Sequence, residues 1–286
     1  MRRAALALLG ALALASCGGA SSQAPAPGPV EPAQAPANRA IVWAVGDGAD
    51  GSPIARKLAR LIAADQPDRF LYLGDVYPSG TATDFRRRYA PVYGRLAEIT
   101  SPTTGNHEWV NRRTGYQPYW RGVTGRPQPY WYSLPLAGWQ LISLSSEAPH
   151  QATSAQLRWL RARLEQPGTC RLAFWHRPRF SAGSVHGDSP DVAPFWRALK
   201  GRARLVVNGH DHLLLRYRKR AGLTEYVAGA GGAVLYRQVP DRRLAFARAG
   251  VTGALRIVLE PGWARLEFRS ATGKVLDRSR ARCKSG

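Results

Sequence analysis

The stretch Asn208-Gly209-His210-Asp211-His212 follows the apolar run Leu205–Val207, and it governs the interpretation of the whole chain. Residues at i and i+2 of an extended segment point to the same side, so both imidazoles can reach one metal ion. Four earlier polar segments also follow apolar runs. They are Gly46-Asp47-Gly48, Gly74-Asp75-Val76-Tyr77, Gly105-Asn106-His107-Glu108 and Trp175-His176-Arg177-Pro178.

Together these segments supply an ordered set of metal-binding side chains. The set comprises Asp47, Asp75, Asn106, His176, His210 and His212. Each lies where a predicted strand ends, and in open α/β sheets ligands bind beyond the carboxyl ends of the strands. Any one of them alone would be read as a turn, cap or surface residue. As a set they can hold two metal ions, and adjacent metals are a common device for hydrolysing phosphate esters.

The alternation of apolar runs and helical patterns predicts an α/β fold with mixed sheets. Capping signals begin helices near Ser52-Pro53, Thr81 or Thr83, and Thr153. A hairpin is expected over 130–144, and short strands over 224–228, 254–259 and 264–268. The segment Trp109–Gln128 is rich in Gly, Pro, Arg and aromatic residues, so we expect a long surface loop there.

Composition places the chain among packed globular proteins with an unusual charge. The 286 residues are 44% hydrophobic, with a formal charge of +22 and a pI near 11.0. Nearly all the cations are arginine, since lysine occurs at only five positions. A basic surface attracts anionic substrates, nucleic acid or acidic lipid headgroups. The arginines form no long run, however, so a GC-rich genome explains most of them and no specific nucleic-acid partner is expected.

The N-terminus has the features of a targeting segment, which we exclude from the fold. Arg2-Arg3 precede a short apolar stretch, and Leu14-Ala15-Ser16-Cys17 resembles a bacterial lipobox. Residues 1–16 are therefore expected to be a lipoprotein signal peptide. Residues 17–38 are expected to be a lipidated Cys17 with a Pro/Ala-rich tether, and 39–286 a catalytic domain. Removing Arg2 and Arg3 with the signal peptide leaves a formal net charge of 22 − 2 = +20 on the mature protein. The alternative is an ordinary secretory signal with an unrelated cysteine.

Two cysteines remain beyond the tether, and we predict that they pair. An exported chain meets an oxidising compartment, where a disulfide between Cys170 and Cys283 is plausible. Cys283 stands in a polar tail near the end of the sequence and would need such an anchor. The alternative is two unrelated thiols.

The motifs resemble those of the calcineurin-like metallophosphoesterases, and within them the chain is most similar to bacterial relatives of purple acid phosphatases. The resemblance covers roughly residues 40 to 283. It implies a four-layer α-β-β-α sandwich of two mixed sheets flanked by helices, with a bimetal site at the strand C-terminal ends. The first ion would be bound by Asp47 and His212, the second by Asn106, His176 and His210, and both by Asp75. His107 would contact the phosphoryl group or its leaving oxygen.

Two positions depart from the family pattern. Many members carry a His two residues after the first Asp, where this chain has Ala49. Purple acid phosphatases use a Tyr three residues after the bridging Asp, where this chain has Pro78, while Tyr77 stands two residues after. Tyr77 is either a ligand of the first ion or a packing residue. A tyrosinate would favour Fe(III), and without it the site would take Mn, Zn or another divalent ion.

Residues outside the ligand set bear on substrate binding. The resemblance implies that His186 meets the phosphate, with a surface histidine as the alternative. Arg177 can bind phosphate bidentately or be a solvated loop residue.

The expected function is a monomeric, membrane-anchored, extracytoplasmic bacterial phosphatase with two metal ions, in which a metal-bound hydroxide attacks the phosphorus of a phosphorylated small molecule. Its membrane contact would be through the N-terminal lipid only. The alternatives are a phosphodiesterase or nuclease on the same bimetal centre, and a surface binding protein with a degenerate site.

Overall fold

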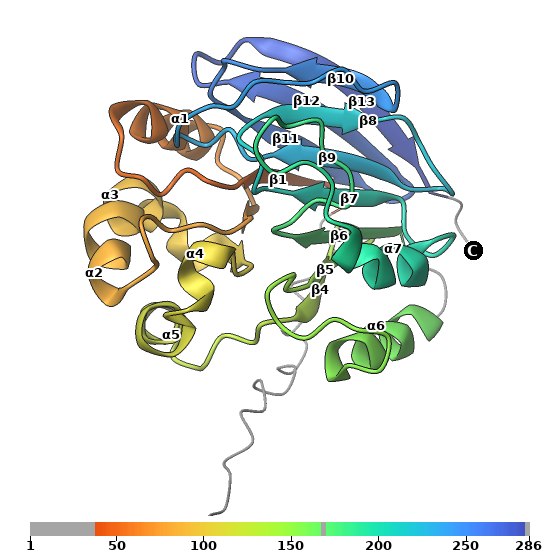
Figure 1. Cartoon of the computed structure of the whole chain (residues 1–286), viewed down its shortest axis with the longest axis horizontal. Coiled ribbons are helices and arrows are strands. Elements are labelled where there is room, and N and C mark those ends of the chain that lie inside the picture. The colour runs from red at the N-terminus through yellow and green to blue at the C-terminus, as the bar shows by residue number, and fades with distance from the viewer. Residues whose placement is uncertain (1–37, 167–169, 284–286) are drawn as a thin grey trace, which may run out of the picture.

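A computed structural model describes residues 38–166 and 170–283 (Figure 1). The predicted signal peptide and Cys17 lie outside these residues. Two mixed sheets account for all strands of the described chain. The first contains β1 (Ala40–Val45), β2 (Arg69–Tyr72), β3 (Thr100–Pro102), β11 (Gly253–Glu260), β12 (Trp263–Ser270) and β13 (Val275–Arg282). The second contains β4 (Tyr132–Leu136), β5 (Trp139–Ser143), β6 (Cys170–Trp175), β7 (Leu205–Asn208), β8 (Leu214–Tyr217), β9 (Thr224–Ala228) and β10 (Leu244–Arg248).

Strand order explains why both sheets are mixed. The first sheet runs β13-β12-β11-β1-β2-β3, with β1, β2 and β3 parallel and the three C-terminal strands antiparallel to their neighbours. The second runs β10-β8-β9-β7-β6-β5-β4, with a parallel centre from β9 to β5. The first sheet therefore contains strands from both ends of the described chain.

Helices flank the two sheets on their outer sides. They are α1 (Pro53–Ala64), α2 (Ala82–Asp84), α3 (Ala90–Tyr93), α4 (Asn106–Trp109), α5 (Gln117–Thr124), α6 (Ala155–Glu165) and α7 (Ala193–Leu199). Figure 1 shows α1 to α5 on one side of the molecule and α6 and α7 on the other. In the described part of the chain, no helix has the length and apolar character needed to cross a bilayer. The predicted four-layer arrangement of two mixed sheets flanked by helices is confirmed.

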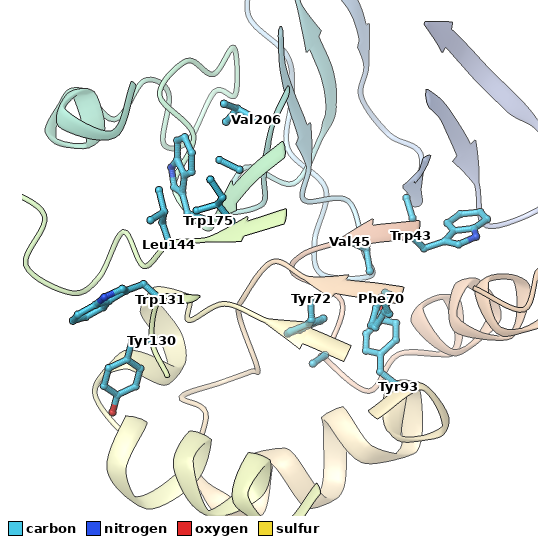
Figure 2. Packing of buried hydrophobic residues seen from close by; sticks show 14 of the residues in the cluster. Trp43, Val45, Phe70, Tyr72, Tyr93, Tyr130, Trp131, Leu144, Trp175 and Val206 are labelled. Carbon is cyan, nitrogen blue, oxygen red and sulfur yellow. The ribbon is translucent and has the colours of Figure 1, made fainter. Parts of the chain in front are cut away.

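The core has one layer between the sheets and others beneath the helices. Leu71, Phe174 and Leu255 belong to the layer between the sheets, where each is fully buried. Trp43 and Phe70 point to the outer face of the first sheet, and Figure 2 shows Phe70 beside Tyr93, with ring centroids 5.2 Å apart. The alternation of side chains along each strand thus fills two layers at once.

The segment 109–128 differs from the surface loop predicted from its composition. It contains a π-helical turn (Arg112–Tyr116) that leads directly into α5. Tyr116 and Trp120 are buried and pack against Tyr89 and Tyr130. Pro118 occupies the first turn of α5, where a proline is tolerated, so the Pro-rich composition misled the prediction.

The structure also contains the disulfide expected between Cys170 and Cys283. Their Cα atoms are 5.5 Å apart, and the bond closes a separation of 113 residues. Both side chains are buried, even though Cys283 stands in a polar tail. The bond attaches the end of β13, in the first sheet, to the start of β6, in the second.

Candidate metal centre

The parallel strands bring the predicted ligands to one rim of the molecule. Val45 of β1 pairs with Tyr72 of β2, so the segments holding Asp47 and Asp75 leave the sheet side by side. Trp175 of β6 pairs with Asn208 of β7, so the segments holding His176 and His210 also leave their sheet side by side. Segments far apart in sequence therefore meet because the register of each strand pair aligns their ends.

The two sheets also meet at this rim. The imidazole Nδ1 of His176, after β6, bonds the carbonyl of Leu73, after β2, at 2.8 Å. The backbone N–H of Gly46 donates to the carbonyl of Ala228, at the end of β9, at 2.9 Å. A Cβ on Gly46 would lie 3.0 Å from the Cα of Gly209, so glycine permits this close approach.

One group of donor atoms surrounds the phenol of Tyr77. Its hydroxyl lies 3.0 Å from Nε2 of His212, 3.3 Å from Oδ1 of Asp47 and 3.5 Å from Oδ2 of Asp75. His212 Nε2 and Asp47 Oδ1 are 3.5 Å apart. These four side chains form what we call the first donor group. Tyr77 thus faces the ligands rather than the core, despite its shifted position in the motif.

A second donor group surrounds Nε2 of His176. This nitrogen lies 3.0 Å from Oδ1 of Asn106, 3.0 Å from Nδ1 of His210 and 3.4 Å from Oδ1 of Asp75. One ligand atom from each of Asp75, His176 and His210 lies within 4.8 Å of the others. Asp75 therefore offers Oδ2 to the first donor group and Oδ1 to the second, as a bridging carboxylate would.

Hydrogen bonds behind the histidines orient the rings for metal binding. Nδ1 of His212 bonds the carbonyl of Val234 at 2.6 Å, and Nδ1 of His176 bonds that of Leu73. A carbonyl can only accept, so each Nδ1 carries a proton and each Nε2 is the nitrogen left to face a donor group. The ring tautomers thus match the needs of a bound cation.

Electrostatics at the rim also fit cation binding. Burial raises the pKa of Asp75 well above its usual range, and the charges of Asp47 and Glu108 raise it further. Burial lowers the pKa of His176 and of His210, which keeps both imidazoles neutral. Burial opposes the charge on Asp47, but its bond to His212 prevails and lowers its pKa. Cations between the carboxylates would offset their repulsion, so this donor set fits two metal ions.

Backbone strain accompanies three of the ligands. Asp47, Asp75 and His210 have φ angles of 60°, 69° and 72°, in the left-handed region that non-glycine residues seldom occupy. Such conformations cost of order 1–3 kcal/mol each and cluster at functional sites. Here they turn the chain sharply after each strand, so that the side chains point back over the rim.

Sequence reasoning missed Glu108, which supports the site from beneath. Its buried carboxylate accepts hydrogen bonds from the backbone N–H groups of Asp75 (3.0 Å), Val76 (3.0 Å) and Gly105 (2.9 Å). Burial raises its pKa to about 7 against the effect of these bonds. Glu108 therefore joins the turn after β2 to the turn after β3. Its place directly after His107 in the Gly-Asn-His-Glu segment was the available signal.

His107 and His186 lie on either side of the donor groups. Nε2 of His107 is 3.7 Å from Oδ2 of Asp75, and its Nδ1 bonds the carbonyl of Pro78. The ring of His186 stacks on that of His210 with centroids 4.1 Å apart. His186 is exposed, and its Nε2 lies 3.4 Å from the hydroxyl of Tyr236. Both histidines therefore border the donor groups without belonging to either.

Arg177 is held in place by a residue that the sequence did not single out. Its Nε and Nη2 donate to the carboxylate of Glu147 at 2.7 and 3.3 Å. Its remaining nitrogen, Nη1, lies 3.5 Å from Nε2 of His210. Glu147 thus fixes the guanidinium with one edge directed at the metal centre.

The sequence and this geometry together identify the family. A sequence model of the calcineurin-like phosphoesterases matches residues 41–214. The chain belongs to the calcineurin-like phosphoesterase family. The matched range contains all six ligands that the motifs predicted, so the family resemblance drawn from those motifs is confirmed.

Solved structures with little sequence identity share the fold. A purple acid phosphatase of yellow lupin matches with a TM-score of 0.72 and 15% identity, over 90% of this chain and 55% of its own. GAP50, described as the anchor in the inner membrane complex of Plasmodium, matches with a TM-score of 0.70 and 14% identity. This match covers 86% of this chain and 90% of GAP50. A dimetal phosphatase of Danio rerio matches with a TM-score of 0.58 and 14% identity, over 85% of this chain and 98% of its own. At such identities the likeness concerns the fold alone.

Glu108 provides a test of how the site is supported. We expect Glu108→Gln to lower the free energy of unfolding by about 1–3 kcal/mol, because an amide cannot accept all three backbone bonds. It should also weaken metal retention, since the turns bearing Asp75 and Asn106 lose their common partner. Thermal unfolding and elemental analysis after dialysis measure the two effects.

The matched control is Glu225→Gln, which removes another buried carboxylate that accepts from two backbone amides, those of Arg179 and Phe180. This control should lose stability and keep its metal. Equal metal retention in Glu108→Gln and the unsubstituted chain would contradict the supporting role.

Proposed function

We propose that this metal-dependent phosphoesterase is an exported, lipid-anchored phosphatase that hydrolyses phosphate monoesters. The observation that carries the catalytic part is the position of Asp75, whose two carboxylate oxygens face two separate donor groups. Family membership supports phosphoester hydrolysis, and the motif at Cys17 supports the anchor. The substrate would be a phosphorylated small molecule.

Asp75 would hold both ions, with Asp47, Tyr77 and His212 on one side and Asn106, His176 and His210 on the other. Bound there, metal ions supply Lewis acidity that activates water and polarises the phosphoryl oxygens. Tyrosine among the donors favours iron at the first position, while the second donor group suits Fe, Mn or Zn equally.

Residues around the donor groups supply the rest of the chemistry. Nδ1 of His107 donates to the carbonyl of Pro78, so Nε2 faces the site, and the ring in its imidazolium form would give the Nε2 proton to the leaving oxygen. Nη1 of Arg177 can bind a phosphoryl oxygen while Glu147 holds the other edge of the guanidinium. His186, above His210, adds a further donor. A monoester carries more negative charge than a diester, so this group of donors favours monoesters.

Activity measurements test the catalytic proposal. Purified protein supplied with metal should hydrolyse an aryl phosphate monoester faster than the corresponding diester or single-stranded DNA. Asp75→Asn and His210→Ala should each lower kcat at least about a thousandfold, because each removes a ligand or bridge. Glu98→Gln, which neutralises an exposed acid away from the rim, should change nothing. Undiminished turnover in both ligand variants would remove this site from consideration, and a faster diester reaction would favour the phosphodiesterase.

Tyr77 gives a spectroscopic test of the first donor group. Iron-loaded protein should show a visible charge-transfer band from a tyrosinate ligand, and Tyr77→Phe should abolish it. The control is Tyr236→Phe, because the ring of Tyr236 stacks on His212 but lies outside the donor group. A band that survives in Tyr77→Phe would show that Tyr77 is a packing residue.

A further inference from the structure

One face of β12 and β13 remains outside the layers of the sandwich. Along β12, Ala264, Leu266 and Phe268 are buried between the sheets, so the residues that alternate with them point outward. Figure 1 shows these strands at the end of the first sheet, away from α2 to α5. The outward set is Arg39, Trp263, Arg265, Arg269, Arg278, Arg280 and Arg282, which we call the arginine face.

Register places these residues in adjacent rows. Trp263 pairs with Arg282, Arg265 with Arg280, and Glu267 with Arg278. Next to the first row, Glu260 of β11 pairs with Trp263 and lies 3.9 Å from Arg39. The arginine face is therefore a continuous surface built from β12 and β13, and Glu260 of β11 connects it to Arg39.

The charge of this face is positive even after its ion pairs are counted. Glu260 is shared by Arg39 and Arg265, and Glu267 by Arg269 and Arg278. Six arginines against two glutamates give 6 − 2 = +4. Within residues 38–166 and 170–283, no acidic side chain pairs with Arg280 or Arg282. The face thus has cations free for an anionic partner.

An exposed tryptophan adds an apolar element. Trp263 is 42% exposed, and the guanidinium of Arg282 stands 4.9 Å from its ring centroid. Tryptophan beside arginine is typical of surfaces at the membrane interface, where the ring enters the headgroup layer and the cation meets lipid phosphate. Arginines on an edge strand also discourage strand addition, but that purpose requires no exposed ring.

The arginine face lies close to the point where the chain from Cys17 enters β1. Arg39 lies on the arginine face, 22 positions after Cys17. A chain spans at most about 3.6 Å per residue, so a lipid on Cys17 lies within about 80 Å of Arg39. The metal centre is at the opposite end of β1, beyond Val45. The row with Arg39 and Trp263 lies beside the start of β1, so a molecule resting on that row would hold its metal centre away from the membrane.

We propose that the arginine face docks on the anionic headgroups of the bilayer that holds the lipid anchor. The lipid anchor and the arginine face would act together as two membrane-binding elements. The lipid would hold the protein at the bilayer, and the arginine face would fix the orientation of the domain. The proposal rests on the anchoring part of the proposed function and is independent of catalysis.

Vesicle binding tests the proposal. Protein that begins at residue 17, with Cys17→Ser so that it cannot be acylated, is sedimented with vesicles of phosphatidylglycerol and phosphatidylethanolamine, and with purely zwitterionic vesicles. We expect stronger binding to the anionic vesicles, weakened by salt. Arg280→Gln/Arg282→Gln should reduce that binding roughly thirtyfold, because each arginine near an anionic membrane surface contributes about 1 kcal/mol. Trp263→Phe should reduce fluorescence quenching by brominated lipid.

The matched control is Arg86→Gln/Arg87→Gln, which removes the same charge from exposed positions on the helical side. It should bind vesicles as the unsubstituted chain does. Equal losses in both double variants would show a general effect of the net charge and overturn the proposal, as would equal binding to zwitterionic vesicles. Tighter binding of single-stranded oligonucleotide than of vesicles by the same face would also overturn it. Hydrolysis of an aryl phosphate, measured separately, reports on catalysis without affecting this result.

Discussion

The structure depends on the shared carboxylate of Asp75. One oxygen faces Tyr77 and the other faces His176, so the two donor groups exist as a pair only because this side chain lies between them. Asp75 is buried beside Asp47 and Glu108, and the charges of both raise its pKa. Without cations that arrangement is unfavourable. The fold holds it through backbone bonds to Glu108 and through a left-handed turn at Asp75 itself.

The ligands come from both sheets, so the two-sheet architecture is needed to bring them together. Asp47 and Asp75 come from the first sheet, and His176, His210 and His212 come from the second. A site that straddles both sheets requires their ends to meet, and the contact of Gly46 with Gly209 and the bond from His176 to Leu73 provide that. The row of the arginine face that holds Trp263 lies at the opposite end of the strands from the metal centre, so binding to a surface and binding of substrate would use separate parts of the molecule.

Much of this was accessible from the sequence, for identifiable physical reasons. Parallel strands are buried on both sides and end abruptly at a polar residue, so the runs before Asp47, Asp75, His176 and His210 marked both the strands and the ligands. The helical segment 112–124 was missed because its proline and two glycines are typical of loops, whereas burial of Tyr116 and Trp120 stabilises the helix.

The remaining features depend on contacts that no local pattern records. Glu108 and Glu147 act through partners about thirty residues away, with Asp75 and Arg177 respectively. The alternation of Arg and apolar residues in β12 was visible, but the pairing of β12 with β13 that assembles the arginine face was not. The place of Tyr77 among the ligands followed from the turn at Asp75, which spacing alone left open.

The most direct test of the shared-carboxylate account is metal stoichiometry. Elemental analysis of the full-length chain, purified after metal loading and dialysis, should give close to two ions per chain. Asp75→Asn should give fewer than one, since the amide leaves one donor group without its Asp75 oxygen and both groups without the carboxylate charge. A single ion in the unsubstituted chain, or two ions retained in Asp75→Asn, would contradict the account.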